Sequence, residues 1–237
     1  MLILAALVVA FAACVQASVG FAYALLAAPL LQLVSPELVP GPVLVSSFVL
    51  SGLTALRERG SIDRRGVALA LIGRVPGALL AGLAIGVLPA KTYDVLYGSV
   101  VLLAVLLSLW SKGVQATPPA LLIAGFASGI MGTLTSVGGP PIALVYQHAA
   151  GPKLRATLNA YFALGAVVSI AVLAHAGQFG AKHGLMGLAL LPAVGLGFYA
   201  SRFTRDRVDG PRLRPAVLWL AALSSLAVVV KALLARG

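Results

Sequence analysis

Long apolar runs separated by short polar loops make up most of the chain. The runs cover residues 2–34, 39–56, 67–88, 94–111, 118–149, 156–175, 184–200 and 215–235. One membrane crossing needs roughly 20 apolar residues in a helix, and most of the runs are close to that length. The runs 2–34 and 118–149 are too long for a single crossing and contain polar and helix-breaking residues, so we predict that each is broken into two helical pieces.

The composition excludes a soluble protein. Of the 237 residues, 60% are hydrophobic and 10% are charged, and the mean hydropathy is +1.04. An ordinary soluble domain is roughly 45–50% apolar and about 25% charged. The single cysteine, Cys14, also excludes a small secreted fold held by disulfides. We therefore predict an all-α, polytopic integral protein of the cell (inner) membrane, surrounded by the lipid bilayer.

The net charge of +11 follows from basic loops between the apolar runs. In a soluble protein such a charge would suggest a nucleic-acid partner, but this distribution is typical of cytoplasmic loops in membrane proteins, so we expect no nucleic acid. The opening residues Met-Leu-Ile-Leu-Ala-Ala-Leu lack the basic stretch of a signal peptide. We expect this segment to belong to the folded protein.

The interruptions in the two long runs match each other. Ser18-Val19-Gly20 in the first run lies 118 positions before Ser136-Val137-Gly138 in the second, which is half the chain length. Matching breaks in two equally long segments indicate an internal duplication, as in many transporters. We predict one membrane domain made of two repeats, residues 1–117 and 118–237.

The distribution of basic residues favours inverted repeats. If all eight runs cross the membrane once, eight basic residues fall on each side. If the two long runs are broken or re-entrant hairpins, each followed by three transmembrane helices, one side collects twelve and the other keeps Lys91, Lys182, Lys231 and Arg236. The twelve are Arg57, Arg59, Arg64, Arg65, Lys112, Lys153, Arg155, Arg202, Arg205, Arg207, Arg212 and Arg214. The positive-inside rule selects the hairpin arrangement, with both termini outside. The same count holds if each hairpin crosses fully.

The broken segments are candidates for an anion site. Irregular backbone at membrane depth is tolerated where it is buried in protein or lines a watery cavity. In Gly138-Gly139-Pro140-Pro141, glycine permits a turn and proline suits the start of a helix, so a half-helix beginning near Pro140 would direct its N–H groups at an anion. A packing kink is the alternative. The candidate residues from the two breaks are Gln16, Ser18, Gly20, Thr135, Ser136, Gly138, Gly139 and Pro140.

These motifs resemble those of a known family. The stretch Gly125-Phe-Ala-Ser-Gly129-Ile-Met-Gly132 that continues to Gly138-Gly139-Pro140-Pro141, and the later Gly151-Pro-Lys153-Leu-Arg155-Ala-Thr157, are similar to motifs of the TauE/SafE sulfite exporters, also called the toluene-sulfonate uptake family. The first repeat departs from the pattern, since its break has one glycine and its proline comes only at Pro29. The resemblance implies small sulfur oxyanions or organic anions, such as sulfite or sulfonates, as substrates.

Three further polar residues within the apolar runs are candidates. Arg74 could bind the anion, because a membrane-embedded arginine is energetically unfavourable and usually functional; the alternative is that it snorkels to the lipid headgroups. Asn159, like Ser46-Ser47, could line the pathway or join helices by hydrogen bonds. His148, which we expect in the second half-helix beside Tyr146 and Gln147, is a candidate for proton coupling, or else an ordinary histidine at a helix end.

The acidic residues limit the chemistry. All six lie in loops or at helix ends, so no carboxylate is available at membrane depth for a proton or sodium relay. The three scattered histidines and the one cysteine give no metal-ligand spacing, so we expect neither a metal nor a cofactor.

The sequence thus predicts a secondary transporter, an exporter of small anions that works by alternating access around a midplane site. An anion channel is the alternative. A membrane enzyme is less favoured, because the pair Ser136 and His148 has no third partner. The anion, the coupling ion and the formation of a homodimer are left open.

Overall fold

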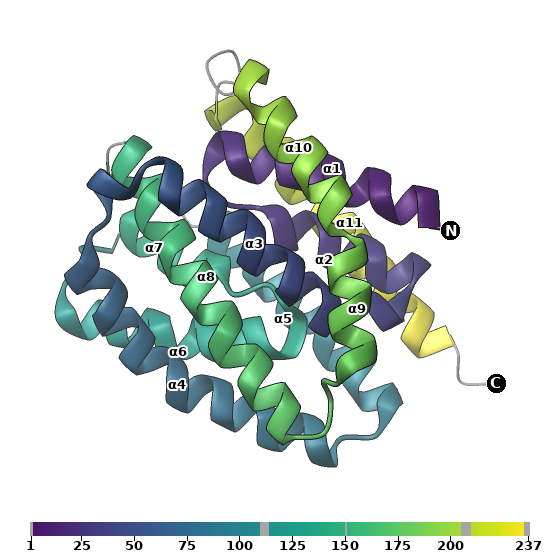
Figure 1. Cartoon of the computed structure of the whole chain (residues 1–237). Helices are drawn as coiled ribbons and strands as arrows, with labels where there is room; N and C mark the ends of the chain where they lie inside the picture. The colour runs from purple at the N-terminus through teal and green to yellow at the C-terminus, as the bar shows by residue number, and fades with distance from the viewer. Residues whose placement is uncertain (1, 110–113, 150, 205–209, 235–237) are drawn as a thin grey trace.

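The computed structural model describes residues 2–109, 114–149, 151–204 and 210–234, and all regular structure in these ranges is helical (Figure 1). The first half contains α1 (Leu2–Val19), α2 (Tyr23–Val34), α3 (Gly41–Arg57), α4 (Arg64–Val87) and α5 (Ala90–Leu109). The second half contains α6 (Pro118–Thr135), α7 (Gly139–Tyr146), α8 (Gly151–His175), α9 (Ala181–Ala189), α10 (Leu191–Thr204) and α11 (Gly210–Leu234). Two short 3₁₀ turns, η1 (Pro36–Leu38) and η2 (Arg59–Ser61), flank α3.

The length and the surface of the helices confirm the all-α polytopic membrane fold. Within the described ranges, six apolar segments are long enough to cross a bilayer, and α9 together with α10 forms one of them. Large apolar side chains such as Leu83, Trp219 and Leu223 are exposed on the outside of the bundle. Such a surface suits lipid, because lipid tails are as apolar as the side chains that face them.

Both long apolar runs are broken, as predicted. The first break lies between α1 and α2, where Gly20 (φ 105°) and Ala22 (φ 107°) have left-handed backbone. The second lies between α6 and α7, where Ser136 (φ 66°) is left-handed. Ala22 and Ser136 are the non-glycine residues with positive φ in the described chain, and strain of this kind gathers at functional sites. A further interruption at Leu190, between α9 and α10, was not predicted; Pro192 lies just beyond it.

The two halves exchange helix partners. Helix α4 of the first half packs along α6 of the second, and α10 of the second half packs along α1 of the first. Helices α3 and α8 lie side by side across the front of Figure 1, and α5 packs against α11. Each of these contacts between the halves therefore has a counterpart with the halves interchanged, or is its own counterpart. This is the pattern that a twofold relation produces, and inverted repeats stay a prediction that it supports.

Glycines allow α4 and α6 to approach very closely. A Cβ atom at Gly73 would lie 2.1 Å from the carbonyl oxygen of Leu122, and one at Gly125 would lie 2.0 Å from that of Ala70. A Cβ atom at Gly77 or Gly129 would likewise lie within 2.3 Å of a backbone carbonyl oxygen of the facing helix. Small residues four apart on facing helices are a standard means of membrane helix packing. The contact places Arg74 of α4 directly beside α6.

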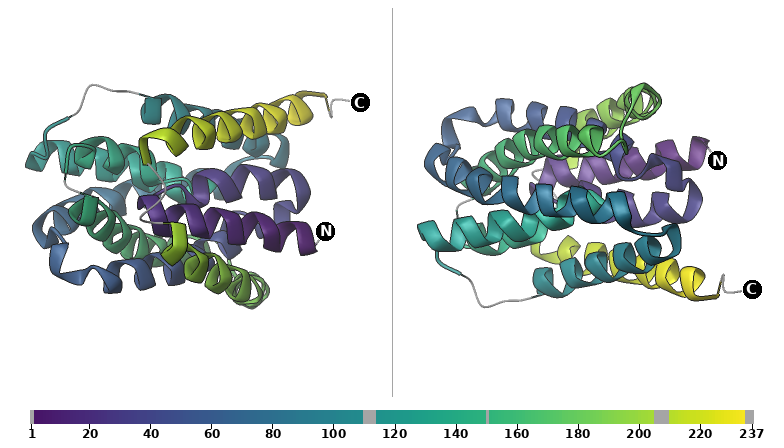
Figure 2. Two further views of the ribbon diagram at one scale, coloured as in Figure 1. Left: turned by 90° about the horizontal axis from the view of Figure 1, so that it is seen from above. Right: turned by 90° about the horizontal axis from the view of Figure 1, so that it is seen from below.

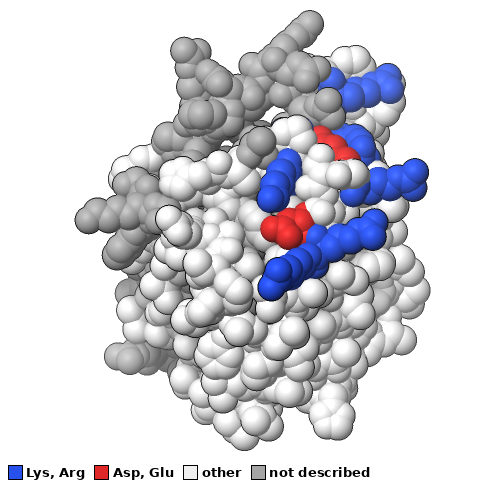
Figure 3. Space-filling view, turned by 90° about the vertical axis from the view of Figure 1, so that its left-hand side faces the viewer, with Lys and Arg blue, Asp and Glu red and all other residues white. Residues whose placement is uncertain are grey.

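Basic side chains gather at one end of the molecule, which we call the basic end (Figure 3). It is defined by Arg57, Arg59, Arg64, Arg65, Lys153 and Arg155, which lie at the end of α3, around η2 and at the starts of α4 and α8. The start of α1 and the end of α11 lie at the opposite end (Figure 2), which we call the terminal end. This separation agrees with the charge argument, whereas the side of the membrane stays a prediction. Lys112, Arg205, Arg207 and Arg236 lie outside the described residues.

Candidate functional site

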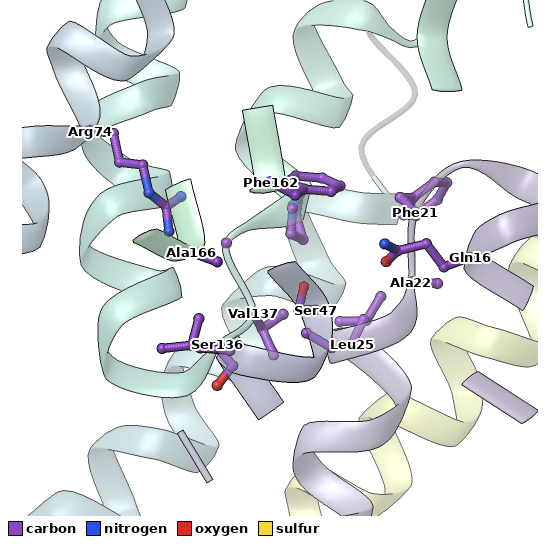
Figure 4. A pocket seen from close by; sticks show the side chains of 15 residues that line it. Gln16, Phe21, Ala22, Leu25, Ser47, Arg74, Ser136, Val137, Phe162 and Ala166 are labelled. Carbon is purple, nitrogen blue, oxygen red and sulfur yellow. The ribbon is translucent and has the colours of Figure 1, made fainter. Parts of the chain in front are cut away.

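The two breaks meet around one central cavity (Figure 4). The volume open to the centre of a water molecule is about 40 Å³, which is room for roughly three waters or one small oxyanion. Both breaks, α3, α8 and one residue of α4 contribute to its wall. The lining residues are Gln16, Phe21, Ala22, Ala24, Leu25, Leu44, Ser47, Arg74, Ser136, Val137, Gly138, Gly139, Pro140, Phe162 and Ala166.

Two helices begin at this cavity. At the start of α2, Ala22, Ala24 and Leu25 line it, and their N–H groups donate no hydrogen bond within the described chain. At the start of α7, the N–H groups of Gly138 and Gly139 are equally free of partners. The N-terminus of a helix carries a partial positive charge and unpaired donors, so both helices favour an anion in the cavity.

The second half-helix begins at Gly139, beside Pro140, as predicted. Pro140 and Pro141 have no N–H group, so they supply no donors to an anion. The donors at this helix start therefore come from the two glycines. Pro140 lines the cavity without offering it a hydrogen-bond donor.

Arg74 brings a full positive charge to the cavity. Its side chain is 3% exposed and is held by neutral oxygen atoms. The guanidinium donates to the Gly165 carbonyl (3.1 Å), the Ser128 hydroxyl (3.0 Å), the Ser169 hydroxyl (2.9 Å) and the Tyr161 hydroxyl (3.3 Å). Among the described residues, the ion pairs are Arg155–Glu58 and Lys153–Asp63, and neither involves Arg74. The snorkelling alternative is therefore wrong, because the guanidinium is bound inside the protein.

The scaffold of Arg74 was not predicted, although the sequence carries a signal for it. Tyr161, Gly165 and Ser169 follow one another at intervals of four in α8, and this spacing places them on one face of a helix. All three accept hydrogen bonds from Arg74. Two hydroxyl side chains and a glycine on one face of an otherwise apolar membrane helix are therefore the sequence signal for this binding site of the Arg74 guanidinium.

Gln16 and Asn159 hold the first break in place. The Gln16 amide nitrogen donates to Ser51 Oγ (2.9 Å) and to Asn159 Oδ1 (3.0 Å), and its oxygen accepts from the Tyr23 N–H (3.0 Å). Asn159 in turn donates to the Gly20 carbonyl at 2.8 Å. Gln16 lines the cavity, but both N–H groups of its amide already donate to other side chains. Asn159 does not line the cavity. Both side chains therefore position the backbone that forms the cavity wall.

Three other predicted residues shape the breaks without lining the cavity. Ser18 donates to the Cys14 carbonyl (2.8 Å) and contacts Thr204 Oγ1 (2.9 Å). Thr135 donates to the Met131 carbonyl (2.8 Å) and accepts from the Val137 N–H (3.1 Å). Gly20 has left-handed backbone (φ 105°), which allows the chain to turn between α1 and α2.

The hydroxyl of Ser136 points out of the central cavity, toward Pro40 and the terminal end. Ser136 lines the cavity, and its hydroxyl donates to the Pro40 carbonyl at 3.0 Å. Of the serine pair in α3, Ser47 lines the cavity, whereas Ser46 hydrogen bonds to Tyr23 at 2.7 Å. The apolar wall residues Phe21 and Phe162 were not predicted, since an apolar residue in an apolar run gives no signal.

His148 does not lie where it was predicted. Helix α7 ends at Tyr146, and His148 is exposed in the turn that follows, outside the cavity lining. The prediction that it belongs to the second half-helix is wrong, because the helix has only eight residues. Ser136 bonds to Pro40 toward the terminal end, whereas α7 leads from the cavity toward the basic end, so the structure does not pair Ser136 with His148.

Two further cavities adjoin the central one, one on each side. The inner cavity, toward the basic end, has about 70 Å³ open to water centres and shares Phe21 and Pro140 with the central cavity. The outer cavity, toward the terminal end, has about 290 Å³ and is lined by residues that include Pro40, Tyr93 and His183. Pro40 is the residue whose carbonyl binds Ser136. The three cavities therefore follow one another along the bundle.

Taken with the fold, this site defines a polytopic membrane protein with a positively charged central cavity between two broken helices. The family model of the sulfite exporter TauE/SafE matches residues 5–228, nearly the whole chain. The chain therefore belongs to the TauE/SafE sulfite exporter family, which confirms the predicted resemblance and the class of membrane transporter. No curated protein and no solved structure matches the chain.

Proposed function

We propose that the protein is a secondary transporter that exports small oxyanions such as sulfite, and that the central cavity is its substrate site. The observation that carries the proposal is the buried guanidinium of Arg74, which lies at a cavity wall without a carboxylate among its described partners. An anion in the cavity supplies the missing negative charge.

The electrostatics of the cavity select the sign of the substrate. Burying an unpaired charge in a membrane protein is unfavourable by several kcal/mol, so such residues are typically functional. Here the charge of Arg74 adds to the positive ends of α2 and α7, and no lining residue is acidic. Phe21 and Phe162 provide low-dielectric walls that strengthen the attraction for an anion. A cation would be repelled by all three positive elements.

The arrangement of the cavities supports alternating access. The central cavity is separated from the inner one by Phe21 and Pro140, and from the outer one by the Ser136–Pro40 contact. The two breaks come from different halves of the chain, and the halves exchange helix partners as inverted repeats do. Rocking one half against the other opens the central cavity toward one neighbour at a time.

The membrane potential is sufficient to drive export. The cavity has no carboxylate to carry a proton or Na⁺, and His148 lies outside its lining. When an anion leaves a cell with a negative interior, its free energy falls by about 2.3 kcal/mol per charge per 100 mV. This energy sustains an outward gradient of roughly fifty-fold for a monovalent anion, since 1.4 kcal/mol is tenfold. The proposed mode is therefore uncoupled, potential-driven efflux.

Transport in proteoliposomes tests the proposal. Vesicles are loaded with sulfite, and K⁺ with valinomycin sets the voltage. We expect sulfite efflux to rise when the interior is negative and to fall when the voltage is reversed, and Arg74→Met to abolish it. Arg64→Gln, at an exposed arginine of the basic end, is the matched control and keeps the wild-type rate. Efflux that ignores voltage and follows a proton gradient contradicts the uncoupled mode, and no sulfite flux at all contradicts the function.

A further inference from the structure

The inner cavity contains a buried donor that no part of the described protein uses. Its wall includes Phe21, Pro140, Ala143, Gln147 and Leu154. The amide nitrogen of Gln147 is buried and has no hydrogen-bond partner. Leaving a buried donor unpaired is unfavourable by about 1–3 kcal/mol, so an unpaired amide at a cavity wall points to a polar ligand. The volume of about 70 Å³ leaves room for roughly five waters or one small oxyanion.

The inner cavity lies between the central cavity and the basic end. Helix α7 joins the two cavities, since Gly139 at its start lines the central one and Gln147, just after its end, lines the inner one. Leu154, on the far wall, lies between Lys153 and Arg155 of the basic end. An anion that moves between the central cavity and the basic end therefore meets Gln147 on its way.

Phe21 is the partition between the two cavities. It lines both of them and lies in the irregular backbone between α1 and α2, flanked by the left-handed residues Gly20 and Ala22. Its ring is therefore not fixed by a helix, in contrast to Pro140 on the opposite wall, which belongs to α7. A rotation of the Phe21 side chain would therefore join the cavities without a movement of α7.

We propose that the inner cavity is a second anion subsite, in which the amide nitrogen of Gln147 binds a small oxyanion in passage between the basic end and the central cavity, with Phe21 as the gate. This subsite deepens the proposed function and rests on it. The amide is neutral, so it holds the anion more weakly than Arg74 does. Weak binding suits a point of passage, because the anion must leave again.

Substitution of Gln147 separates the subsite from the central site. Gln147→Met keeps the length of the side chain and removes the donor. We expect equilibrium binding of sulfite to change less than twofold, because Arg74 and the two helix starts are untouched, and the transport rate to fall about tenfold. Gln147→Glu, which places a negative charge in the passage, should slow transport further. Gln115→Leu, at an exposed glutamine in the loop before α6, is the matched control and should leave both quantities unchanged.

Thiol labelling tests the gate independently of transport. In a Cys14→Ser background, Ala143→Cys places the single thiol on the wall of the inner cavity. Because sulfite also consumes thiol reagents, a thiol at the exposed Gln115→Cys is the reference. We expect sulfite to slow the reaction of Ala143→Cys with a membrane-impermeant thiol reagent, added from the basic end, more than that of the reference, and Gln147→Met to remove this extra protection. Phe21→Ala, which joins the cavities, should speed the reaction of a thiol at Ala166→Cys in the central cavity.

The outcomes distinguish the two proposals. If wild-type protein binds and exports sulfite while Gln147→Met exports it at the wild-type rate, the subsite is wrong and the central site stands. The same holds if sulfite gives no protection at Ala143→Cys. If wild-type protein neither binds nor moves sulfite, the proposed function fails, and the subsite fails with it.

Discussion

The charge of Arg74 is the feature whose removal should have the largest effect on substrate binding. Arg74→Met keeps a long, flexible side chain in the same space and removes both the charge and the donors. The hydroxyl groups of Ser128 and Ser169 keep other partners, at the Gly138 carbonyl and at Thr133, and the Gly165 carbonyl lies inside α8, so the change leaves mainly the Tyr161 hydroxyl without its partner. Because an uncompensated buried charge is also removed, we expect the stability of the anion-free protein to stay within about 2 kcal/mol of the wild type.

The loss of binding follows from Coulomb's law. A guanidinium and a monovalent anion about 5 Å apart attract each other by about 3 kcal/mol at an effective dielectric constant near 20. Removing this attraction weakens binding by roughly 150-fold, since about 1.4 kcal/mol corresponds to a factor of ten. Arg74→Lys keeps the charge and loses the planar fork that reaches Ser128, Gly165 and Ser169 together. It should therefore bind more weakly than the wild type and more tightly than Arg74→Met.

Thermal unfolding of the purified protein, with sulfite and with chloride, measures both effects. Wild-type protein should unfold at a rising temperature as sulfite is added, because a ligand that binds only the folded state stabilises it. Arg74→Met should start from a similar unfolding temperature and show almost no rise, whereas Arg64→Gln should follow the wild type. The reasoning is refuted if folded Arg74→Met binds sulfite as tightly as the wild type.

Four substitutions and two fusions test other parts of the protein. Gly165→Ala places a Cβ about 2.6 Å from Arg74 Nε, so it should displace the guanidinium and weaken sulfite binding at least tenfold in the same thermal assay, although the charge remains. Gly139→Ala has room, with its Cβ 3.4 Å from the Phe162 ring, and should still transport, whereas Gly139→Leu should fill the cavity and stop transport while the protein still reaches the membrane. Gly20→Ala should destabilise the fold by about 2 kcal/mol in denaturant titrations, because φ is 105° and Arg155 Cγ lies 2.6 Å from the new Cβ. Alkaline phosphatase fused to the C-terminus should be active and a fluorescent fusion dark, and a cytoplasmic C-terminus would contradict the hairpin topology.

The breaks could be predicted from the sequence because they combine two independent signals. Each lies in an apolar run too long for one crossing, and each contains residues that interrupt helices, such as Gly20 and Gly138. Chain length and backbone preference are local properties, so they are readable without a structure. The central cavity follows from these breaks, and Gln16, Arg74, Ser136 and Gly139, which we predict to bind substrate, lie on its wall.

The orientation of single side chains depends on neighbours far away in the sequence and was less predictable. Ser18 and Thr135 lie at the right breaks, yet their hydroxyls turn back to the carbonyls of Cys14 and Met131, which serine and threonine do commonly in membrane helices. His148 was placed in a helix that ends two residues earlier. Phe21, the proposed gate, carries no polar signal, and only its place at the wall of two cavities distinguishes it.

The placement of the acidic residues explains how Arg74 stays available to a substrate. Glu58 pairs with Arg155 at 2.9 Å, and Asp63 caps α4 and accepts from Tyr146, so these carboxylates are held at the basic end. Asp94 accepts from Gln32 at 3.2 Å, near the start of α5. A carboxylate beside Arg74 would neutralise it and compete with the substrate, whereas hydroxyl and carbonyl groups orient the guanidinium and leave its charge unbalanced. In the proposed function, neutral ligands around the cation, with these acids kept at the helix ends, therefore leave the transported anion as the counterion of the site.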